Sequence, residues 1–108
     1  LNDFKGTMSE NYVDAQLVAN GYTPYYWEYD REAEVDFVIP EEKLAIQVSY
    51  SMADSDTLKR ETDGLIKLST VQNVKRMMVV TKDEEDIVEK EGCRIEIIPL
   101  WKWLLEFL

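Results

Sequence analysis

The 108-residue sequence predicts an α/β domain, with a mixed sheet of about five strands and helices on both faces. Two observations lead to this prediction. Apolar residues recur at every second position over residues 34–50, as in a β-hairpin, and a helical pattern separates this hairpin from two later apolar runs. A helix between two strands of one sheet makes a right-handed crossover, which pairs the strands in parallel. The predicted order is helix, three strands, helix, two strands and a final helix.

A capping box is expected to open the first helix. Thr7 would be its N-cap and Glu10 would reach back from the third helical position. Gly21 suits the position just past the end of a helix. Because Glu10, Val13 and Leu17 share one stripe, Glu10 is expected at the end of the stripe that faces the sheet. The same residue is explained without any function by the capping box alone.

The next segment, residues 21–29, is read as an aromatic first strand. Its cluster Tyr22 to Trp27 could stack nucleic-acid bases, although such clusters are more often the core of a sheet. The central hairpin follows, with Pro40 to Lys43 as a polar turn that pairs Ile39 with Leu44. Counting back along an antiparallel ladder brings Asp36 opposite Gln47. This register places Glu34, Asp36, Gln47 and Ser49 on one face and Val35, Phe37, Ile46 and Val48 on the other.

The later elements follow from apolar periodicity and charge. We expect a helix over residues 56–68 capped by Asp54, Ser55 or Asp56, a doubly buried strand over 75–81, a charged loop with a short helical turn over 82–92, a strand over 93–99 and a helix over 100–108. The residues of the last helix expected to pack are Trp101, Leu104, Leu105 and Leu108. Gln47 and Ser49, if they have no catalytic role, are expected as plain polar residues beneath the first helix.

Composition narrows the classes of function. Twelve basic and 22 acidic residues give a net charge of −10, which counts against a DNA-binding surface. Without histidine, His-based catalytic triads and His-ligated zinc are excluded. A single cysteine, Cys93, cannot form an internal disulfide and fits a reducing, cytoplasmic setting. No apolar run is long enough for a membrane span, and no Walker-type loop is present to bind ATP.

Four segments carry a resemblance to a known family. Their order and spacing resemble the PD-(D/E)XK nuclease layout and, more closely, an uncharacterised C-terminal domain attached to prokaryotic AAA-type ATPases. The segments are Leu1–Gly6 followed by Ser9–Val13, then Tyr25–Trp27, Ala33–Val38 and Pro99–Leu104. The resemblance covers nearly the whole chain. It implies a restriction-endonuclease-like fold, with residues 1–108 as a single domain that is the C-terminal fragment of a longer ATPase chain.

The resemblance also implies a site. In family members that keep the nuclease pattern, three acidic residues bind Mg²⁺ and a lysine steadies the charge that develops on the phosphate. Carried over to this sequence, the metal positions fall on Glu10, Asp36 and Gln47, and the catalytic positions on Asp36, Gln47 and Ser49. A neutral amide and a hydroxyl therefore stand where a Glu-x-Lys pair is expected, so we expect metal binding to be weak or lost. Lys43 and Lys59 are the candidates for a substitute cation.

Three functions stay open at this point. The first is a non-catalytic, degenerate nuclease domain that contacts its own ATPase domain, a protein partner, a second copy or DNA, the last disfavoured by charge. The second is a Mg²⁺-dependent DNA endonuclease or exonuclease with an altered site. The third is a structural or oligomerisation module. Mg²⁺ is a cofactor only if the site still functions, and ATP would bind only in an upstream domain. No membrane partner is expected.

Overall fold

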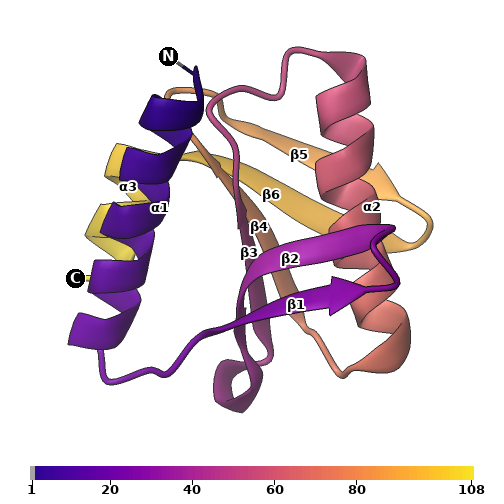
Figure 1. Ribbon diagram of the computed structural model, residues 1–108, viewed down its shortest axis with the longest axis horizontal. Helices are drawn as coiled ribbons and strands as arrows, with labels where there is room; N and C mark the ends of the chain where they lie inside the picture. The colour runs from indigo at the N-terminus through magenta and orange to yellow at the C-terminus, as the bar shows by residue number, and fades with distance from the viewer. Residues whose placement is uncertain (1) are drawn as a thin grey trace.

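The computed structural model describes residues 2–108, with side chains described from Thr7 onward. One sheet of six strands lies between two helical layers (Figure 1). The elements are α1 (Asn2–Ala19), β1 (Tyr25–Tyr29), β2 (Ala33–Ile39), the 3₁₀ turn η1 (Pro40–Glu42), β3 (Leu44–Val48), α2 (Ser55–Val71), β4 (Arg76–Thr81), β5 (Asp86–Lys90), β6 (Cys93–Pro99) and α3 (Leu100–Glu106). The predicted α/β class with a mixed sheet is confirmed. The predicted count of about five strands is one too few.

Parallel strands form the centre of the sheet, whose order is β1-β2-β3-β4-β6-β5. The pairs β3–β4 and β4–β6 are parallel, and a hairpin closes each side. The crossover through α2 confirms the predicted parallel pairing of β3 with β4. All of Met77 to Val80 in β4 is buried, because helices cover both faces of this strand.

The missed strand is β5. The sequence favoured a loop with a helical turn over residues 82–92, but Asp86 to Lys90 pair antiparallel with β6. A tight turn with positive φ at Glu91 (51°) and Gly92 (77°) joins the two strands. An edge strand tolerates the charged residues that made this segment look like a loop, since one side of it meets water.

The start of α1 also differs from the prediction. The helix begins at Asn2, so Thr7 lies inside it and is not its N-cap. The capping box was therefore wrong, because Thr7 and Glu10 have the right spacing at an interior position. The end of the helix is as predicted: Gly21 has a φ of 85°, and Tyr22 N–H donates to the Leu17 carbonyl at 3.1 Å. At the start of α2, the carboxylate of Asp54 accepts from the backbone N–H groups of Asp56 and Thr57, as a capping residue does.

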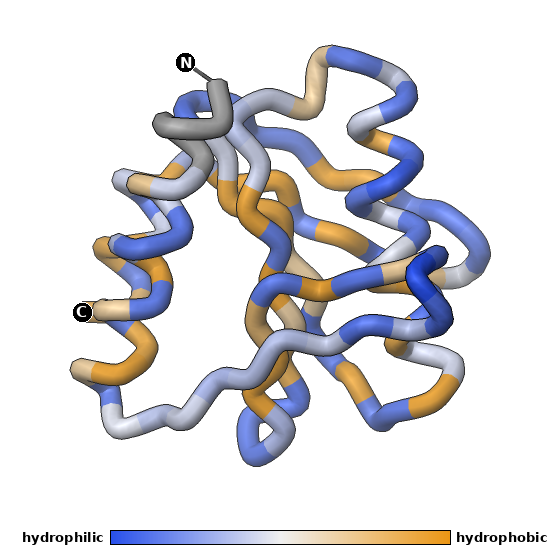
Figure 2. The backbone as a smooth tube through the Cα atoms, viewed as in Figure 1, coloured by the Kyte–Doolittle hydropathy of each residue, from blue (hydrophilic) through white to orange (hydrophobic). Residues whose placement is uncertain are grey.

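Two hydrophobic cores lie on opposite faces of the sheet. The core on the α2 face contains Val35, Val38, Ala45, Leu65, Leu68, Met77, Val79 and Ile95, among others. The core on the α1 and α3 face contains Val13, Leu17, Ile39, Ile46, Met78, Val80 and Trp103, among others. Figure 2 shows hydrophobic residues running along the strands and through the α1–α3 pair. None of the helices in residues 2–108 has the length and apolar character needed to cross a membrane.

Two predictions about aromatic and apolar packing were wrong in part, although Leu104 of α3 packs on the core as predicted, and Tyr22 and Trp27 of the aromatic cluster pack on the two cores. In α3, Trp103 is fully buried and stacks on Phe107 with 4.5 Å between ring centroids, while Trp101 is 60% exposed. Leu105 and Leu108 are exposed as well. Both sides of this short helix are apolar, so periodicity could not tell which side packs. In β1, only Trp27 packs on the core, because β1 is an edge strand and its tyrosines face solvent.

Candidate functional site

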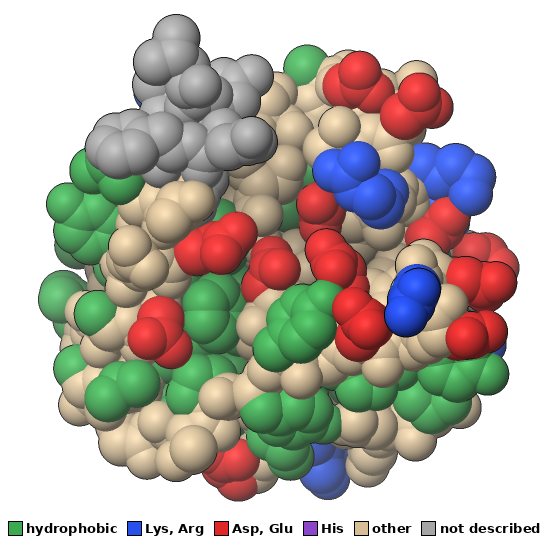
Figure 3. All heavy atoms as spheres, in the orientation of Figure 1, with side chains coloured by type: hydrophobic (Ala, Val, Ile, Leu, Met, Phe, Trp, Pro, Cys, Tyr) green, Lys and Arg blue, Asp and Glu red, His purple; other side chains and the backbone are tan. Residues whose placement is uncertain are grey.

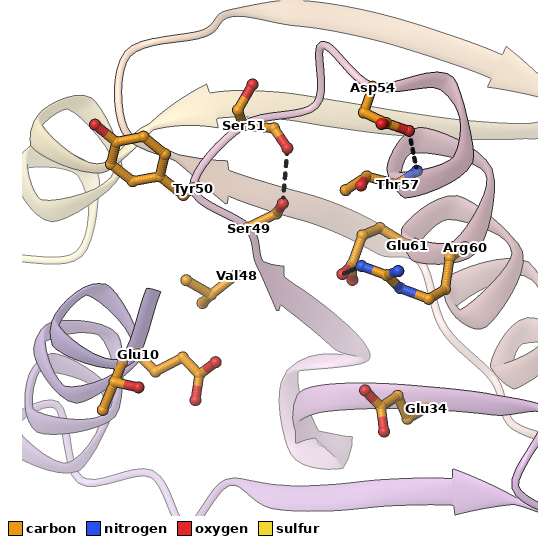
Figure 4. Close-up of a pocket in the computed structure, with 11 residues that line it drawn as sticks. Glu10, Glu34, Val48, Ser49, Tyr50, Ser51, Asp54, Thr57, Arg60 and Glu61 are labelled. Carbon is orange, nitrogen blue, oxygen red and sulfur yellow. Dashed lines mark hydrogen bonds and ion pairs between the residues drawn. The ribbon is translucent and has the colours of Figure 1, made fainter. Parts of the chain in front are cut away.

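A cleft of about 650 Å³ opens between α1 and α2 at the end of β3 (Figure 4). Helices α1 and α2 stand on opposite sides of the sheet (Figure 1). The residues that line the cleft are Thr7, Glu10, Glu34, Val48, Ser49, Tyr50, Ser51, Asp54, Thr57, Arg60 and Glu61. Of the four residues to which the resemblance assigns a role, Glu10 and Ser49 line the cleft.

Three carboxylates point into this cleft, each from a different element. Figure 4 shows Glu10 from α1, Glu34 from β2 and Glu61 from α2 converging on the same space. Burial and the charge of Glu34 raise the pKa of Glu10 above its ordinary value. Burial also raises the pKa of Glu61, while nearby Arg60 opposes that shift from 3.5 Å. Acidic side chains gather across the middle of this face, with few basic ones among them (Figure 3).

Asp36 lies behind the cleft and is not among its lining residues. Its Oδ2 accepts a hydrogen bond from the Val48 N–H at 2.8 Å, and its own N–H donates to Gln47 Oε1 at 3.0 Å. Regular pairing between β2 and β3 ends at Phe37 and Ile46, so these two side chains continue the ladder where the backbones diverge. Burial raises the Asp36 pKa to about 7; the Val48 N–H lowers it, and the charges of the three cleft glutamates raise it further.

The buried side chain of Gln47 links β3 to β2 and to α2 through hydrogen bonds. It is 1% exposed, and its amide hydrogen-bonds to backbone groups of β2 and α2. Besides accepting from Asp36 N–H, it donates from Nε2 to the carbonyls of Glu34 at 2.7 Å and Glu61 at 3.2 Å. The predicted cross-strand closeness of Asp36 and Gln47 is therefore confirmed. The expectation that Gln47 lies beneath the first helix is wrong, since its amide contacts α2.

The faces predicted for β2 were wrong in part. Pairs Val38–Ala45 and Ile39–Leu44 occur as expected, and Phe37 and Ile46 share the α1 face. Val35, however, packs in the core beneath α2. The reason is a bulge: Tyr25 pairs with Val38 while Trp27 pairs with Val35, so β2 has one residue more than β1 over this stretch. An extra residue reverses the alternation of faces along the strand. The hydrophobic pattern of β2 does not indicate this bulge.

Gly64 explains how α2 comes close enough to reach Gln47. A Cβ at this position would lie 2.4 Å from the Glu34 carbonyl oxygen and 2.9 Å from Gln47 Nε2. Glycine in the middle of a helix costs about 0.5–1 kcal/mol relative to alanine. The close approach of α2 to the backbone of β2 accounts for the glycine here.

Ser49 lines the cleft without touching any cation among the interactions described. Its Oγ donates to the Ser51 carbonyl at 2.9 Å. The loop after β3 is held in turn by Glu84, whose carboxylate accepts from Ser51 Oγ at 2.7 Å and from Met52 N–H at 2.6 Å. These contacts fix the rim of the cleft to the loop that follows β4.

The substitute cations considered from the sequence do not reach the cleft. Lys43 lies in the turn after η1, and Lys59 pairs with Asp63 at 2.6 Å on the outer face of α2. From Thr7 onward, the cation that lines the cleft is Arg60, which sequence reasoning missed together with Glu61. A signal was available, because a helix that follows a strand in a crossover starts near the carboxyl end of that strand.

The residues implied as magnesium ligands do not fit a metal ion as arranged. Gln47 Oε1 and Asp36 Oδ2 each accept a backbone N–H, and Glu10 approaches from the other side of the cleft. Mg²⁺ demands near-octahedral oxygen ligands at close range. Between Thr7 and Leu108, no three or more Asp, Glu or Cys side chains are grouped so that they could hold a metal ion.

Comparison with known proteins gives the family. Residues 5–103 match the family described as "Domain of unknown function (DUF4143)". The chain belongs to this family. It is also similar to "Uncharacterized protein MJ1544" of Methanocaldococcus jannaschii, with 31% identity over 112 residues, covering 95% of this chain and 25% of that protein. The chain thus spans about a quarter of the length of this relative. No solved structure matches.

The resemblance to an uncharacterised domain family is confirmed by this match. The nuclease character and the ATPase setting, which are finer statements, stay predictions. The match adds no residue roles, so the roles assigned to Glu10, Asp36, Gln47 and Ser49 also stay predictions.

Proposed function

We propose that this is a non-catalytic accessory domain with a degenerate restriction-endonuclease-like fold, which serves an AAA-type ATPase through contacts and not through cleavage. The observation that carries the proposal is the bonding of Gln47. The position where a nuclease needs a metal-binding carboxylate holds an amide whose oxygen and nitrogen are already bonded to β2 and α2. The Gln47 side chain therefore holds β2, β3 and α2 together. Turning it towards a metal would leave buried backbone groups without hydrogen-bond partners, at a cost of about 1–3 kcal/mol each.

The surroundings of Gln47 support the same proposal. Asp36 is tied to the Val48 N–H, and its raised pKa means that a proton occupies part of the population near neutral pH. The cleft offers Arg60 beside Glu61 where a lysine near Ser49 would face a phosphate. A net charge of −10 repels a polyanion before it reaches the cleft. The ATPase setting rests on the resemblance.

Nuclease assays test the proposal directly. We expect no cleavage of plasmid or single-stranded DNA by the chain with Mg²⁺ or Mn²⁺, because a single lost charge stabiliser commonly lowers a rate about 10²–10³-fold. Asp36→Ala is the control for contamination. Robust cleavage that disappears in Asp36→Ala would overturn the proposal, whereas cleavage that survives it would come from another enzyme.

Descent from an active nuclease has a separate test. The double variant Gln47→Glu with Ser49→Lys should gain affinity for Mn²⁺, measured by calorimetry against the unmodified chain. Circular dichroism must first show that the variant folds, because Glu at position 47 loses donors to the Glu34 and Glu61 carbonyls. A folded double variant that binds no metal would contradict the descent.

One observation favours a second candidate, a nuclease with a relocated site. Glu61 and Arg60 project from α2 into the cleft that Glu10 and Glu34 also line (Figure 4). They would take over the missing acid and cation of the third strand. This candidate predicts cleavage that is lost in Glu61→Gln and in Arg60→Ala. Absence of cleavage in the unmodified chain would rule it out.

A further inference from the structure

Apolar side chains are exposed on the side of α1 and α3 that faces away from the sheet. Met8 and Tyr12 lie four residues apart on α1, Trp101 and Leu105 lie four residues apart on α3, and Leu108 follows just after the end of α3. We name these five residues the α1/α3 outer face. Their exposed fractions run from 43% for Met8 to 82% for Leu108. The buried residues Val13, Leu17 and Trp103 lie on the opposite sides of the same helices.

The two helices lie together, so their apolar stripes belong to one surface. Gln16 Nε2 and Asn20 Nδ2 on α1 both donate to the Phe107 carbonyl at the end of α3, each at 2.6 Å. Figure 1 shows the two helices side by side on one side of the sheet, and Figure 3 shows hydrophobic side chains along the margin that α1 forms. Two apolar stripes on adjacent helices make a patch, unlike single exposed residues.

The charged side chains of α3 are directed away from the patch. Lys102 and Glu106 of α3 form ion pairs with Glu85 and Arg76, which lie towards the sheet. Glu10 of α1 points into the cleft. Asp14 of α1 is exposed as well, but two residues along a helix from Tyr12 it lies off the stripe that Met8 and Tyr12 share. A helix that is apolar on both sides is normally buried on both sides.

We infer that the α1/α3 outer face is covered by an apolar surface of another domain of the same polypeptide, in the longer proteins of this family. This inference rests on the proposed function, since it names the surface through which the accessory domain makes contact. The relative covered to only 25% by this chain shows that family members carry much additional sequence. A domain tethered nearby has an effective concentration in the millimolar range, so a small patch suffices to hold it.

A second copy of the chain fits this surface less well. Stable dimers typically bury about 20–30 residues on each side, and the outer face has five. Each copy would also bring a net charge of −10, and that repulsion is greatest at low salt. Contacts between domains of one chain are smaller than dimer interfaces, and they do not bring together two copies of the same net charge.

The test uses the full-length archaeal relative and the 108-residue chain. Hydroxyl-radical labelling should modify Trp101 and Tyr12 in the chain, while the residues aligned with them in the intact relative should be protected. In the relative, Glu is introduced at the positions aligned with Tyr12 and Leu105. Limited proteolysis between its domains should then be faster by on the order of tenfold, which corresponds to the loss of about 1.4 kcal/mol of contact free energy. Glu at the positions aligned with exposed Lys59 and Thr70 of α2 is the matched control.

Three results would overturn the inference. One is equal labelling of these positions in the chain and in the intact relative. Another is charged residues at the aligned positions of the relative. The third is sedimentation of the 108-residue chain as a dimer that Leu105→Glu dissociates, because the occupant is then a second copy. The nuclease assays measure cleavage, which none of these three results depends on. Failure of the proposed function is therefore distinguishable from failure of this inference.

Discussion

The two faces of the sheet are covered by helical layers of different character. On one face, α2 has buried residues such as Leu65 and Leu68 inward and a charged outer surface. That outer surface is stabilised within the domain: Asp63 bonds Lys59 at 2.6 Å and Lys90 at 2.7 Å, and Lys67 lies 4.5 Å above the Tyr29 ring. On the other face, α1 and α3 bury one side and present apolar residues on the other.

The outer surface of α2 is thus satisfied without a partner, whereas the outer face of α1 and α3 leaves apolar side chains in water. A charged outer face needs no partner, because water and neighbouring charges satisfy it. An apolar outer face gains about 25 cal/mol for each Å² that a partner removes from water. Covering the outer face of α1 and α3 would therefore favour association of the domain with a partner. The outer surface of α2 is stabilised by contacts within the domain and offers no such gain.

The largest effect expected from this comparison separates two tryptophans of α3. Trp103→Ala should lower the free energy of unfolding by about 3–5 kcal/mol, because it empties a fully buried site and removes the stack with Phe107. Trp101→Ala should change it by less than about 0.5 kcal/mol, since that side chain is 60% exposed. Urea unfolding followed by circular dichroism measures both.

The pair is its own control, because both changes remove a tryptophan from the same short helix. A loss for Trp101→Ala as large as that for Trp103→Ala would show that the outer face is already packed in the isolated domain. The comparison between the two layers would then fail.

A smaller effect is expected on the α2 side. Gly64→Ala should lower the free energy of unfolding by about 2–3 kcal/mol. The new Cβ would meet the Glu34 carbonyl at 2.4 Å and push α2 away from Gln47, an overpacking cost that exceeds the roughly 1 kcal/mol gained from a better helix former. Thermal unfolding of Gly64→Ala beside Thr70→Ala, at an exposed position of α2, gives the measurement. A stabilised Gly64→Ala would mean that the helix can move away without loss.

Much of the fold was predictable, because several local patterns agree with each other. The turn at Pro40 to Lys43 and the apolar alternation on both sides of it determine the hairpin register through Phe37 and Ile46. Gly21 marks the end of α1, and the run Met77 to Val80 marks the doubly buried strand. Each of these signals acts within a few residues, so the sequence contains it in full.

What could not be predicted depends on contacts distant in the sequence. The bulge that turns Val35 towards α2 arises from pairing with β1, and the inward side of α3 is chosen by packing on the sheet. The candidate site divides in the same way. Closeness of Asp36 and Gln47 followed from strand register, but the bonds from Gln47 to α2 depend on Gly64, which no strand pattern reveals.

The smallest effect expected concerns Asp36, at the seam between the two layers where neither covers the sheet fully. Burial and the charges of the nearby glutamates raise its folded-state pKa to about 7, against an ordinary value of 3.8. Between those two values the folded chain holds a proton that the unfolded chain has released. The contribution of Asp36 to stability therefore falls as the pH rises from about 4 to about 7, and it stays low above that range.

Asp36→Asn removes the charge and keeps an oxygen that can accept the Val48 N–H. It should raise the free energy of unfolding at pH 8 by about 1–2 kcal/mol, which is less than the full pKa difference because the side chain is partly exposed. At pH 4.5 the gain should nearly vanish, since the wild-type carboxyl is then protonated in the folded state. Some pH dependence will persist, because the pKa values of Glu10 and Glu61 are raised for the same reason. Asp14→Asn, on the exposed side of α1, is the control, with urea unfolding at both pH values. Destabilisation of Asp36→Asn at pH 8 would show that the fold favours the carboxylate, and the framework role assigned to Asp36 would be wrong.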